Sequence, residues 1–333
     1  MQPIAADVTH FKIRQNIKPG NGPAHGSRHR TEKLKLEPKM NELNFICDYK
    51  RRNDYRQSFN SLANKVFGID FEKWYEKGFW NDRYICYSFA DNGRIVSNVS
   101  ISKIDLIING AEKKATQIGT VMTLAEYRNR GLAKKLMNKV LTDCADACDL
   151  IFLFANNDSA SFYTQFGFDA LKESEYFIEI EKHSADNNGG VRRLDISNRA
   201  DALIIEDILS MRLPVSKALG VKNAQHIFNW YCCNVFKDNL YLIDDPGIIT
   251  AYNIKDNILN IYDILYREKK LFYDVLKKIA TKKVDKVIFH FMPDFHDLQN
   301  IKCNPLASED VLFVKPSSKW NIEKFKYPMT AQA

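Results

Sequence analysis

One stretch near the middle of the chain restricts the possible folds more than any other. Residues 115–122 are apolar and β-branched enough for a buried strand, and apolar side chains recur at helical spacing after residue 131. Between them lies a basic turn of the form Arg-x-x-Gly-x-Ala, made by Arg128, Gly131 and Ala133. The sequence therefore predicts a strand, a short glycine turn and a helix that begins at that turn.

A turn of this kind is an anion site. The first amides of a helix have no partner within the helix, and the helix dipole favours negative charge there. Gly131 and Ala133 leave room for a phosphate to approach the main chain, and Arg128 and Arg130 add full positive charge. The Gly-Lys-Ser/Thr ending of a nucleotide P-loop is absent, and so are the three glycines of a Rossmann loop. We interpret the stretch as a cradle for a pyrophosphate.

The cradle resembles the acyl-CoA site of GNAT N-acetyltransferases, whose signature is Arg/Gln-x-x-Gly-x-Gly/Ala after the fourth strand. Ala125 stands where many members carry proline, a difference that affects only the stiffness of the loop. A second match follows a short apolar strand at residues 150–155. Asn156, then Tyr163 seven residues later, then Gly167-Phe168, resembles the second GNAT signature. The two signatures occur in the order that this family requires.

The resemblance implies an α/β (α+β) chain with the GNAT fold, a mixed and largely antiparallel sheet flanked by helices, over a catalytic domain at residues 40–184. The local patterns agree with that order of elements. They predict helix within 51–79, strands at 84–90, 94–101 and 104–108, and then the cradle strand at 115–123.

After a linker at residues 186–190, residues 191–333 repeat the order of strands, helix and strand. Where a second cradle would lie, residues 263–271 contain no glycine, and Glu268 would repel a phosphate. The second half therefore resembles a degenerate GNAT-like unit that binds no CoA, as in a bacterial subgroup distantly similar to the enhanced-intracellular-survival acetyltransferases. The predicted elements are helices at about 200–211, 223–236 and 270–280 and strands at 240–243, 248–252, 259–265 and 286–291.

The distribution of charged and apolar residues limits the kinds of partner that we expect this chain to bind. Of the net charge of +7, residues 1–39 carry +5, from eight basic and three acidic side chains, which leaves +2 for the rest of the chain. We interpret residues 1–39 as a basic leader that is disordered, and we expect no nucleic-acid partner because the remaining chain has no basic stripe. No apolar run is long enough to span a membrane, no signal-peptide pattern opens the chain, and the seven cysteines are scattered. These features favour a cytoplasmic protein without a membrane partner.

Metal ligands are not expected. Cys144 and Cys148 lie four residues apart on a predicted helix, but no histidine is near them in sequence, so we interpret them as packed thiols.

The resemblance implies roles for several residues in acetyl transfer. The cosubstrate acetyl-CoA would be held by the cradle and by the strand end before it, and the Thr123 N–H would point at the acetyl oxygen. Tyr163 would give a proton to the departing thiolate; alternatively, it is a core tyrosine among Phe162 and its neighbours. Asn156 would bind the pantetheine arm or cap a helix. The predicted CoA-binding residues are Val121, Met122, Thr123, Arg128, Asn129, Arg130, Gly131, Leu132, Ala133 and Asn156.

The sequence identifies the general base of the reaction less clearly than the other catalytic groups. Many relatives place a glutamate on the fourth strand, where this chain has Gln117 and Thr120, and Glu126 lies at the cradle, away from the thioester. A water chain is one possibility. The other possibility follows from the resemblance to the enhanced-intracellular-survival acetyltransferases, in which the terminal carboxylate enters the active site and acts as the base. By this resemblance, the carboxylate of Ala333 would be the general base.

We therefore expect a catalytic domain that transfers an acetyl group to a primary amine of a small molecule or peptide by direct attack. The first alternative is an acyl-CoA-binding sensor without turnover, and the second is a nucleic-acid-binding protein that uses residues 1–39. The acceptor pocket should lie at the first helices, with Phe71, Trp74, Phe79 and Trp80 as candidates. His226, His290 and His296 lack the spacing of metal ligands and are expected to be structural or on the surface.

Overall fold

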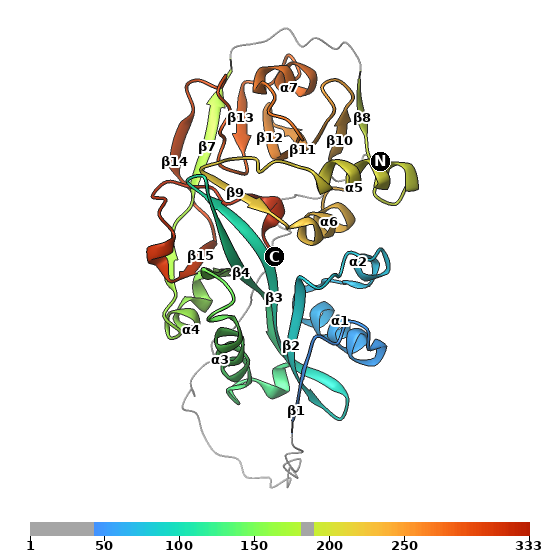
Figure 1. The fold of residues 1–333 in the computed structure, drawn as a ribbon, viewed down its shortest axis with the longest axis vertical. Coiled ribbons are helices and arrows are strands. Elements are labelled where there is room, and N and C mark those ends of the chain that lie inside the picture. The colour runs from blue at the N-terminus through green and yellow to red at the C-terminus, as the bar shows by residue number, and fades with distance from the viewer. Residues whose placement is uncertain (1–42, 181–189) are drawn as a thin grey trace, which may run out of the picture.

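Two mixed β-sheets, each flanked by helices, form the part of the chain that the structure describes (Figure 1). The structure is a computed structural model that describes residues 43–180 and 190–333. The predicted leader at residues 1–39 and residues 186–189 of the predicted linker lie outside these ranges. The expected α/β (α+β) fold, with mixed and largely antiparallel sheets in two units, is confirmed.

The first sheet has the strand order β1-β2-β3-β4-β5-β15-β6, and β9 adds to β3. Among the described strands of this sheet, β4 and β5 alone pair in parallel. The strands are β1 (Asn44–Cys47), β2 (Tyr84–Asp91), β3 (Arg94–Ile108), β4 (Ala111–Thr123), β5 (Leu150–Asn156), β6 (Asp169–Leu171), β9 (Leu219–Lys222) and β15 (Asp310–Lys315).

One expected boundary is wrong. Residues 94–101 and 104–108 are not two strands, because β3 continues through them and pairs with β4 as far as Ile108. The polar residues Ser102 and Lys103 resemble a break in sequence. In the structure, however, Ser102 pairs with Gln117 and Lys103 pairs with Thr116 of β4, so both belong to one continuous strand.

Helices α1 (Asn53–Phe67) and α3 (Leu132–Cys144) cover opposite faces of the first sheet (Figure 1). The α1 helix stops at Gly68, which takes φ +70° and donates its N–H to the carbonyl of Asn64. Each helix turns one apolar stripe to the sheet, and this places the cradle turn, just before α3, at the end of β4. The buried stripe residues include Tyr55, Phe59 and Leu62 on α1 and Leu136, Met137 and Val140 on α3.

The second sheet has the order β14-β7-β13-β12-β11-β10-β8, and its central parallel pair is β12 with β13. Helix α7 (Phe272–Ile279) buries an apolar face against it, while α5 (Arg199–Ser210) and α6 (Gln225–Asn234) precede its central strands. The strands are β7 (Ser174–Glu179), β8 (Val191–Arg193), β10 (Leu240–Ile243), β11 (Ile248–Lys255), β12 (Ile258–Leu265), β13 (Lys286–Phe289) and β14 (Lys302–Pro305).

The two sheets exchange strands. β7 comes early in the chain, directly after β6, yet it pairs with β13 and β14 in the second sheet. β15 comes after the whole of the second sheet, yet it fills the place between β5 and β6 in the first. Each sheet is therefore completed by a strand from the other half of the sequence.

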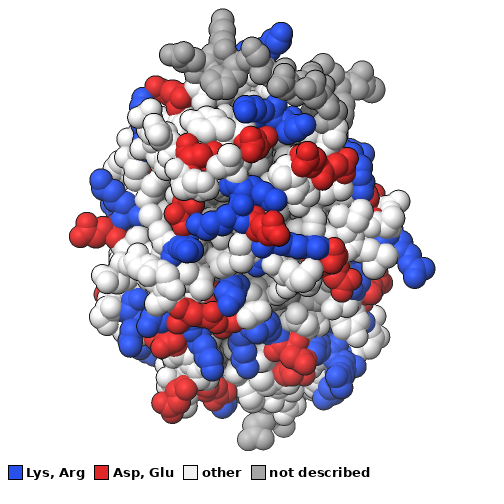
Figure 2. Space-filling view, turned by 45° about the horizontal axis from the view of Figure 1, so that its top comes forward, with Lys and Arg blue, Asp and Glu red and all other residues white. Residues whose placement is uncertain are grey.

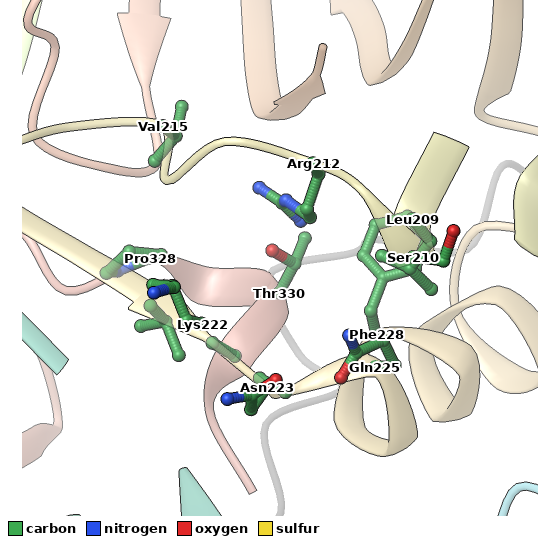
Figure 3. A pocket seen from close by; sticks show the side chains of 13 residues that line it. Leu209, Ser210, Arg212, Val215, Lys222, Asn223, Gln225, Phe228, Pro328 and Thr330 are labelled. Atoms are coloured by element: carbon green, nitrogen blue, oxygen red, sulfur yellow. The ribbon is translucent and has the colours of Figure 1, made fainter. Parts of the chain in front are cut away.

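The last residues of the chain cross from the second sheet to the first. The short helix η5 (Met329–Ala331) begins where β12 and β13 diverge, and the Met329 N–H donates to the carbonyl of His290 at 3.0 Å. The Thr330 hydroxyl bonds the carboxylate of Asp263. That carboxylate also accepts two bonds from Arg212, at 2.8 and 2.9 Å, and Figure 3 shows Arg212 and Thr330 facing one another. The tail thus fills the gap between β12 and β13 in the second sheet.

A buried ion pair holds the start of this tail. The carboxylate of Glu173 lies 2.8 Å from the Lys326 ammonium and accepts the N–H of Tyr327, also at 2.8 Å. We expect Glu173→Gln to lower the free energy of unfolding by about 3 kcal/mol, because the Lys326 charge stays buried without an anionic partner. Urea unfolding measures the change.

The matched control is Glu179→Gln, since Glu179 pairs with Lys302 at 2.6 Å with both side chains exposed to solvent. This change should cost less than about 1 kcal/mol. Equal effects of the two substitutions would show that burial does not decide the strength of the Glu173 pair.

Candidate functional site

The central strands of the first sheet separate at the place where the cradle begins. β4 and β5 pair in parallel from Ala115–Ile118 with Leu150–Leu153, and this pairing stops at Ile118 although β4 continues to Thr123 and β5 to Asn156. β4 carries a bulge here, since its register against β3 shifts between Asn98 and Ser100. A bulge turns main-chain groups out of a ladder, so the end of β4 is directed towards the gap.

The bulge is held by buried side chains. Thr120 has φ +42°, a left-handed conformation that is strained for a β-branched residue. Asn98 donates its amide N–H to the Thr120 carbonyl at 2.9 Å, and the hydroxyls of Tyr84 and Thr120 lie 2.9 Å apart. These bonds fix an unusual backbone in the middle of the sheet, beside the predicted site.

Thr123 presents its main chain to the gap. The N–H of Leu124 donates to Val96 on β3, and hydrogen bonding alternates along an antiparallel strand, so the N–H and carbonyl of Thr123 face away from β3. The carbonyl accepts a bond from Arg128 Nε at 3.2 Å. The Thr123 hydroxyl lies 2.8 Å from that of Ser97 on β3. The structure thus fixes the Thr123 N–H so that it points away from β3, towards the gap.

The cradle turn is open and left-handed at two positions. Asn129 has φ +61°, and Gly131, the residue before α3, has φ +73°. A Cβ added at Gly131 would meet no atom within 4 Å, so the space over this residue is empty. Arg130 donates to the Glu126 carbonyl at 2.8 Å, which pins the turn. The amides at the start of α3 therefore face a groove that no side chain of the turn closes.

This cradle groove encloses about 730 Å³ including its open mouth. It contains all the predicted CoA-binding residues except Arg130 and Asn156. Tyr127, Lys134 and Phe162 also line it and were not predicted. The full lining is Val121, Met122, Thr123, Tyr127, Arg128, Asn129, Gly131, Leu132, Ala133, Lys134 and Phe162.

Asn156 caps a helix. Its side-chain oxygen accepts the N–H of Ser159 at 3.1 Å and the Ser159 hydroxyl at 2.7 Å, at the start of η3 (Asn157–Ser159). Of the two interpretations of Asn156, the cap is the one that the geometry shows.

Tyr163 lies behind the wall of the groove. It sits on α4 (Ala160–Thr164), it is fully buried, and its ring packs against Phe162 and against Phe313 of β15, with centroids 5.1 and 5.7 Å away. Burial raises the pKa of the phenol above its ordinary value near 10. Tyr163 belongs to the same buried cluster as Val121 at the end of β4, but it does not itself line the cradle groove.

The chain ends at this same gap. The Gln117 amide donates to the Ala333 oxygen at 3.5 Å, and a Cβ on Gly119 would lie 3.4 Å from the Ala333 carbonyl carbon. The tail thus lies within van der Waals distance of β4 at Gly119. The Tyr231 hydroxyl holds the preceding residue by donating to the Gln332 carbonyl at 3.1 Å. The structure therefore brings Ala333 to the start of the divergence between β4 and β5.

A pocket next to this end, here called the terminal pocket, has four Phe, Trp or Tyr side chains among its eleven lining residues. It contains Phe71 and Trp74, two of the four predicted acceptor-pocket residues, but not Phe79 or Trp80. Its lining residues are Phe71, Trp74, Tyr84, Ser102, Gly119, Thr120, His226, Ile227, Trp230, Gln332 and Ala333. Within the described ranges, the terminal carboxylate is the only acidic group that the lining residues supply.

The resemblance implied that the second half helps to shape the acceptor pocket, but the sequence did not indicate which of its residues would do so. His226 and Trp230 come from α6, and the Trp74 indole donates to the His226 carbonyl at 2.7 Å, which joins α6 to α2 (Glu72–Glu76). His226 was expected to be structural or on the surface. It is buried and lines the pocket, and no local spacing in the sequence indicates this, because the contact spans the two halves.

Figure 2 shows Lys and Arg side chains interspersed with Asp and Glu over the face in view, with no continuous basic stripe there. The described residues include no group of three or more His, Cys, Asp or Glu placed to hold a metal ion. In the same ranges, no helix combines the length and apolar character that crossing a bilayer requires.

Comparisons with known proteins agree on the fold. A family model described as an acetyltransferase (GNAT) domain matches residues 50–171. A conserved protein from Enterococcus faecalis, described as a probable N-acyltransferase, is 16% identical over 82% of this chain and 72% of its own, with a TM-score of 0.53. A GCN5-related N-acetyltransferase from Kribbella flavida is 15% identical over 81% and 71%, with a TM-score of 0.50.

Eis1 from Mycobacterium abscessus is also similar, at 15% identity over 79% of this chain and 72% of its own, with a TM-score of 0.49. No curated protein matches the sequence. At these identities the structures from Enterococcus faecalis and Kribbella flavida show the fold alone, and the family model covers residues 50–171 of the 333.

Proposed function

We propose that this chain, whose residues 50–171 are a GNAT acetyltransferase domain, transfers an acetyl group from acetyl-CoA to a primary amine. The acceptor is a small molecule or a peptide. The observation that carries the proposal is the coincidence of three features at one gap in the first sheet: the open cradle groove, the outward-facing Thr123 main chain and the terminal pocket.

The cradle groove would hold the pyrophosphate. Main-chain amides at the start of α3 supply the donors, and the emptiness over Gly131 lets an anion reach them. Arg128 lines the groove and Arg130 lies beside it, so both add positive charge. Val121 and Met122 would pair with the pantetheine arm along the edge of β4, while the side chain of Asn156 serves as a helix cap.

The Thr123 N–H would stabilise the oxyanion. As the amine attacks the thioester carbonyl, negative charge develops on the acetyl oxygen, and a fixed donor at that point typically contributes about 2–4 kcal/mol. The strained bulge at Thr120 supports this role, because buried hydrogen bonds hold the strand end in a set direction before the substrate arrives.

Two groups would carry the protons. The terminal carboxylate of Ala333 would accept the proton that the amine loses as the new C–N bond forms. Tyr163 would donate a proton to the sulfur as the C–S bond breaks, which suits a phenol whose pKa burial keeps high. The products are an acetamide and free CoA. The cysteines, all seven free, favour a cytoplasmic setting for this reaction.

A substitution at the cradle tests CoA binding. Gly131→Ala places a methyl group in the space where the pyrophosphate would lie, and we expect it to weaken acetyl-CoA binding at least tenfold by calorimetry.

The control is Gly68→Ala. Gly68 has nearly the same φ, +70°, and is equally open, so the two substitutions share the same backbone strain. If both variants bind acetyl-CoA alike, the cradle is not the pyrophosphate site. An acyl-CoA sensor would bind acetyl-CoA in the same way but would release no CoA when amines are added, so a CoA-release assay separates it from the enzyme.

A further inference from the structure

The cradle turn, residues 124–131, has little packing of its own. All of its residues are exposed except Leu124, which is buried, and Tyr127, which is partly buried. Two of the exposed residues, Asn129 and Gly131, have left-handed backbone conformations. An exposed turn with few apolar contacts opens easily unless it is bonded to a more rigid part of the fold. The shape of the cradle therefore depends on contacts from outside the turn.

Tyr127 makes such a contact. Its hydroxyl donates to the carboxylate of Asp91 at 2.5 Å, across 36 positions of sequence. This hydrogen bond, with partial burial and the charge of Asp91, raises the pKa of the Tyr127 phenol, so the hydroxyl stays a donor. The Arg130 guanidinium lies over the Tyr127 ring, 4.8 Å from its centroid. Tyr127 thus joins the turn to a carboxylate on a different element.

Asp91 is itself held in a tight hairpin. It is the last residue of β2 and pairs with Arg94, the first residue of β3. Asn92 and Gly93 between them have φ +47° and +79°, the left-handed pair that fits the twist of a two-residue hairpin. The Asp91 Oδ1 atom is buried and has no hydrogen-bond partner within residues 43–180 and 190–333. The bond from Tyr127 is therefore the main polar contact of this carboxylate.

We infer that Asp91 is a positioning residue for the cosubstrate. By holding Tyr127 it keeps the cradle turn in the open shape that receives the pyrophosphate, although Asp91 does not line the cradle groove. The inference rests on the proposed function, because it concerns binding of acetyl-CoA at the same site. A turn that is open before the cosubstrate arrives loses less conformational freedom on binding, and a turn that is open only part of the time binds more weakly by that fraction.

Two substitutions remove the bond from opposite sides. Tyr127→Phe deletes the hydroxyl and keeps the ring on the groove wall, and Asp91→Ala deletes the acceptor. Each should raise the Kd of acetyl-CoA about tenfold by calorimetry, as expected for a hydrogen bond to a charged group. KM for acetyl-CoA should rise in parallel, while kcat at saturating acetyl-CoA changes less than twofold. Asp91→Asn keeps a neutral acceptor and should raise the Kd only about threefold.

The double variant distinguishes positioning from direct contact. Because both substitutions remove the same bond, Tyr127→Phe with Asp91→Ala should bind acetyl-CoA as each single variant does, and not about a hundredfold more weakly. If the Tyr127 hydroxyl bound acetyl-CoA directly, Asp91→Ala would leave the affinity unchanged, and the inference is then overturned. Tyr241→Phe is the control. Its hydroxyl donates to the carbonyl of Asp238 at 3.0 Å, beside the second sheet, and its loss should not change the affinity.

Failure of the proposed function gives a different result. If the unchanged protein binds no acetyl-CoA, the proposed function is wrong, and hydrogen exchange of the ligand-free protein decides the inference. The amides of residues 127 and 128 donate to the carbonyls of Leu124 and Ala125, at 2.9 and 3.3 Å. In Tyr127→Phe and Asp91→Ala these amides should exchange about tenfold faster, which supports the hold of Asp91 on the turn. Exchange at the rate of the unchanged protein excludes it.

Discussion

Adding two glycines after Ala333 should lower kcat about 10³-fold. The terminal carboxylate lies at the start of the gap between β4 and β5, held by Gln117 and by the close approach to Gly119. An extension moves this charge away from the point where the amine loses its proton. Removing a general base typically costs about 10² to 10⁴ in rate.

The measurements must distinguish the loss of the general base from a general displacement of the C-terminal tail by the two added glycines. The residues before Ala333 are buried and bonded through Tyr231 and Asp263, so the extended protein should keep its thermal midpoint and its affinity for acetyl-CoA. A carboxypeptidase that trims the two glycines should restore the rate. An extended enzyme that turns over at the normal rate would assign the base to a water chain instead.

Replacing Tyr163 with Phe should also lower kcat about 10³-fold while KM for acetyl-CoA changes little. The substitution removes one hydroxyl from a fully buried ring that packs on Phe313, so the packing is kept and the proton donor is lost. Steady-state kinetics with acetyl-CoA and a primary amine that the unchanged enzyme acetylates measure the effect.

Tyr87→Phe is the control, because Tyr87 is also a buried tyrosine in the cluster on the α3 face. It should change kcat less than twofold. The pH profile provides a second check. Burial raises the pKa of Tyr163, so the phenol stays protonated and kcat should not fall between pH 7 and 9. Full activity in Tyr163→Phe would leave this residue as part of the core alone.

The cradle could be predicted from sequence because its determinants are local. One strand end, one glycine with positive φ and one helix start lie within about twenty residues, and each has a signal that does not depend on the rest of the fold. Most helices and central strands were also predictable, since their apolar periodicity reflects a single buried face.

The strand exchange could not be predicted in the same way. The alternation in residues 310–315 indicates a strand, but nothing in it specifies that its partners are β5 and β6 and not the nearby strands of the second sheet. The terminal pocket depends on that exchange and on α6, which brings His226 next to Trp74 across 152 positions of sequence. Such pairings are set by packing between distant segments, which a single sequence does not display.

The exchange has a consequence for how the protein is made. On the ribosome, β5 emerges long before β15, and the whole second sheet is synthesised in between. An N-terminal half that has just been translated therefore cannot close its own sheet and exposes the edge of β5 until β15 arrives. We expect the nascent chain to depend on chaperones during that interval, and both halves to reach their native state together after synthesis has passed residue 315.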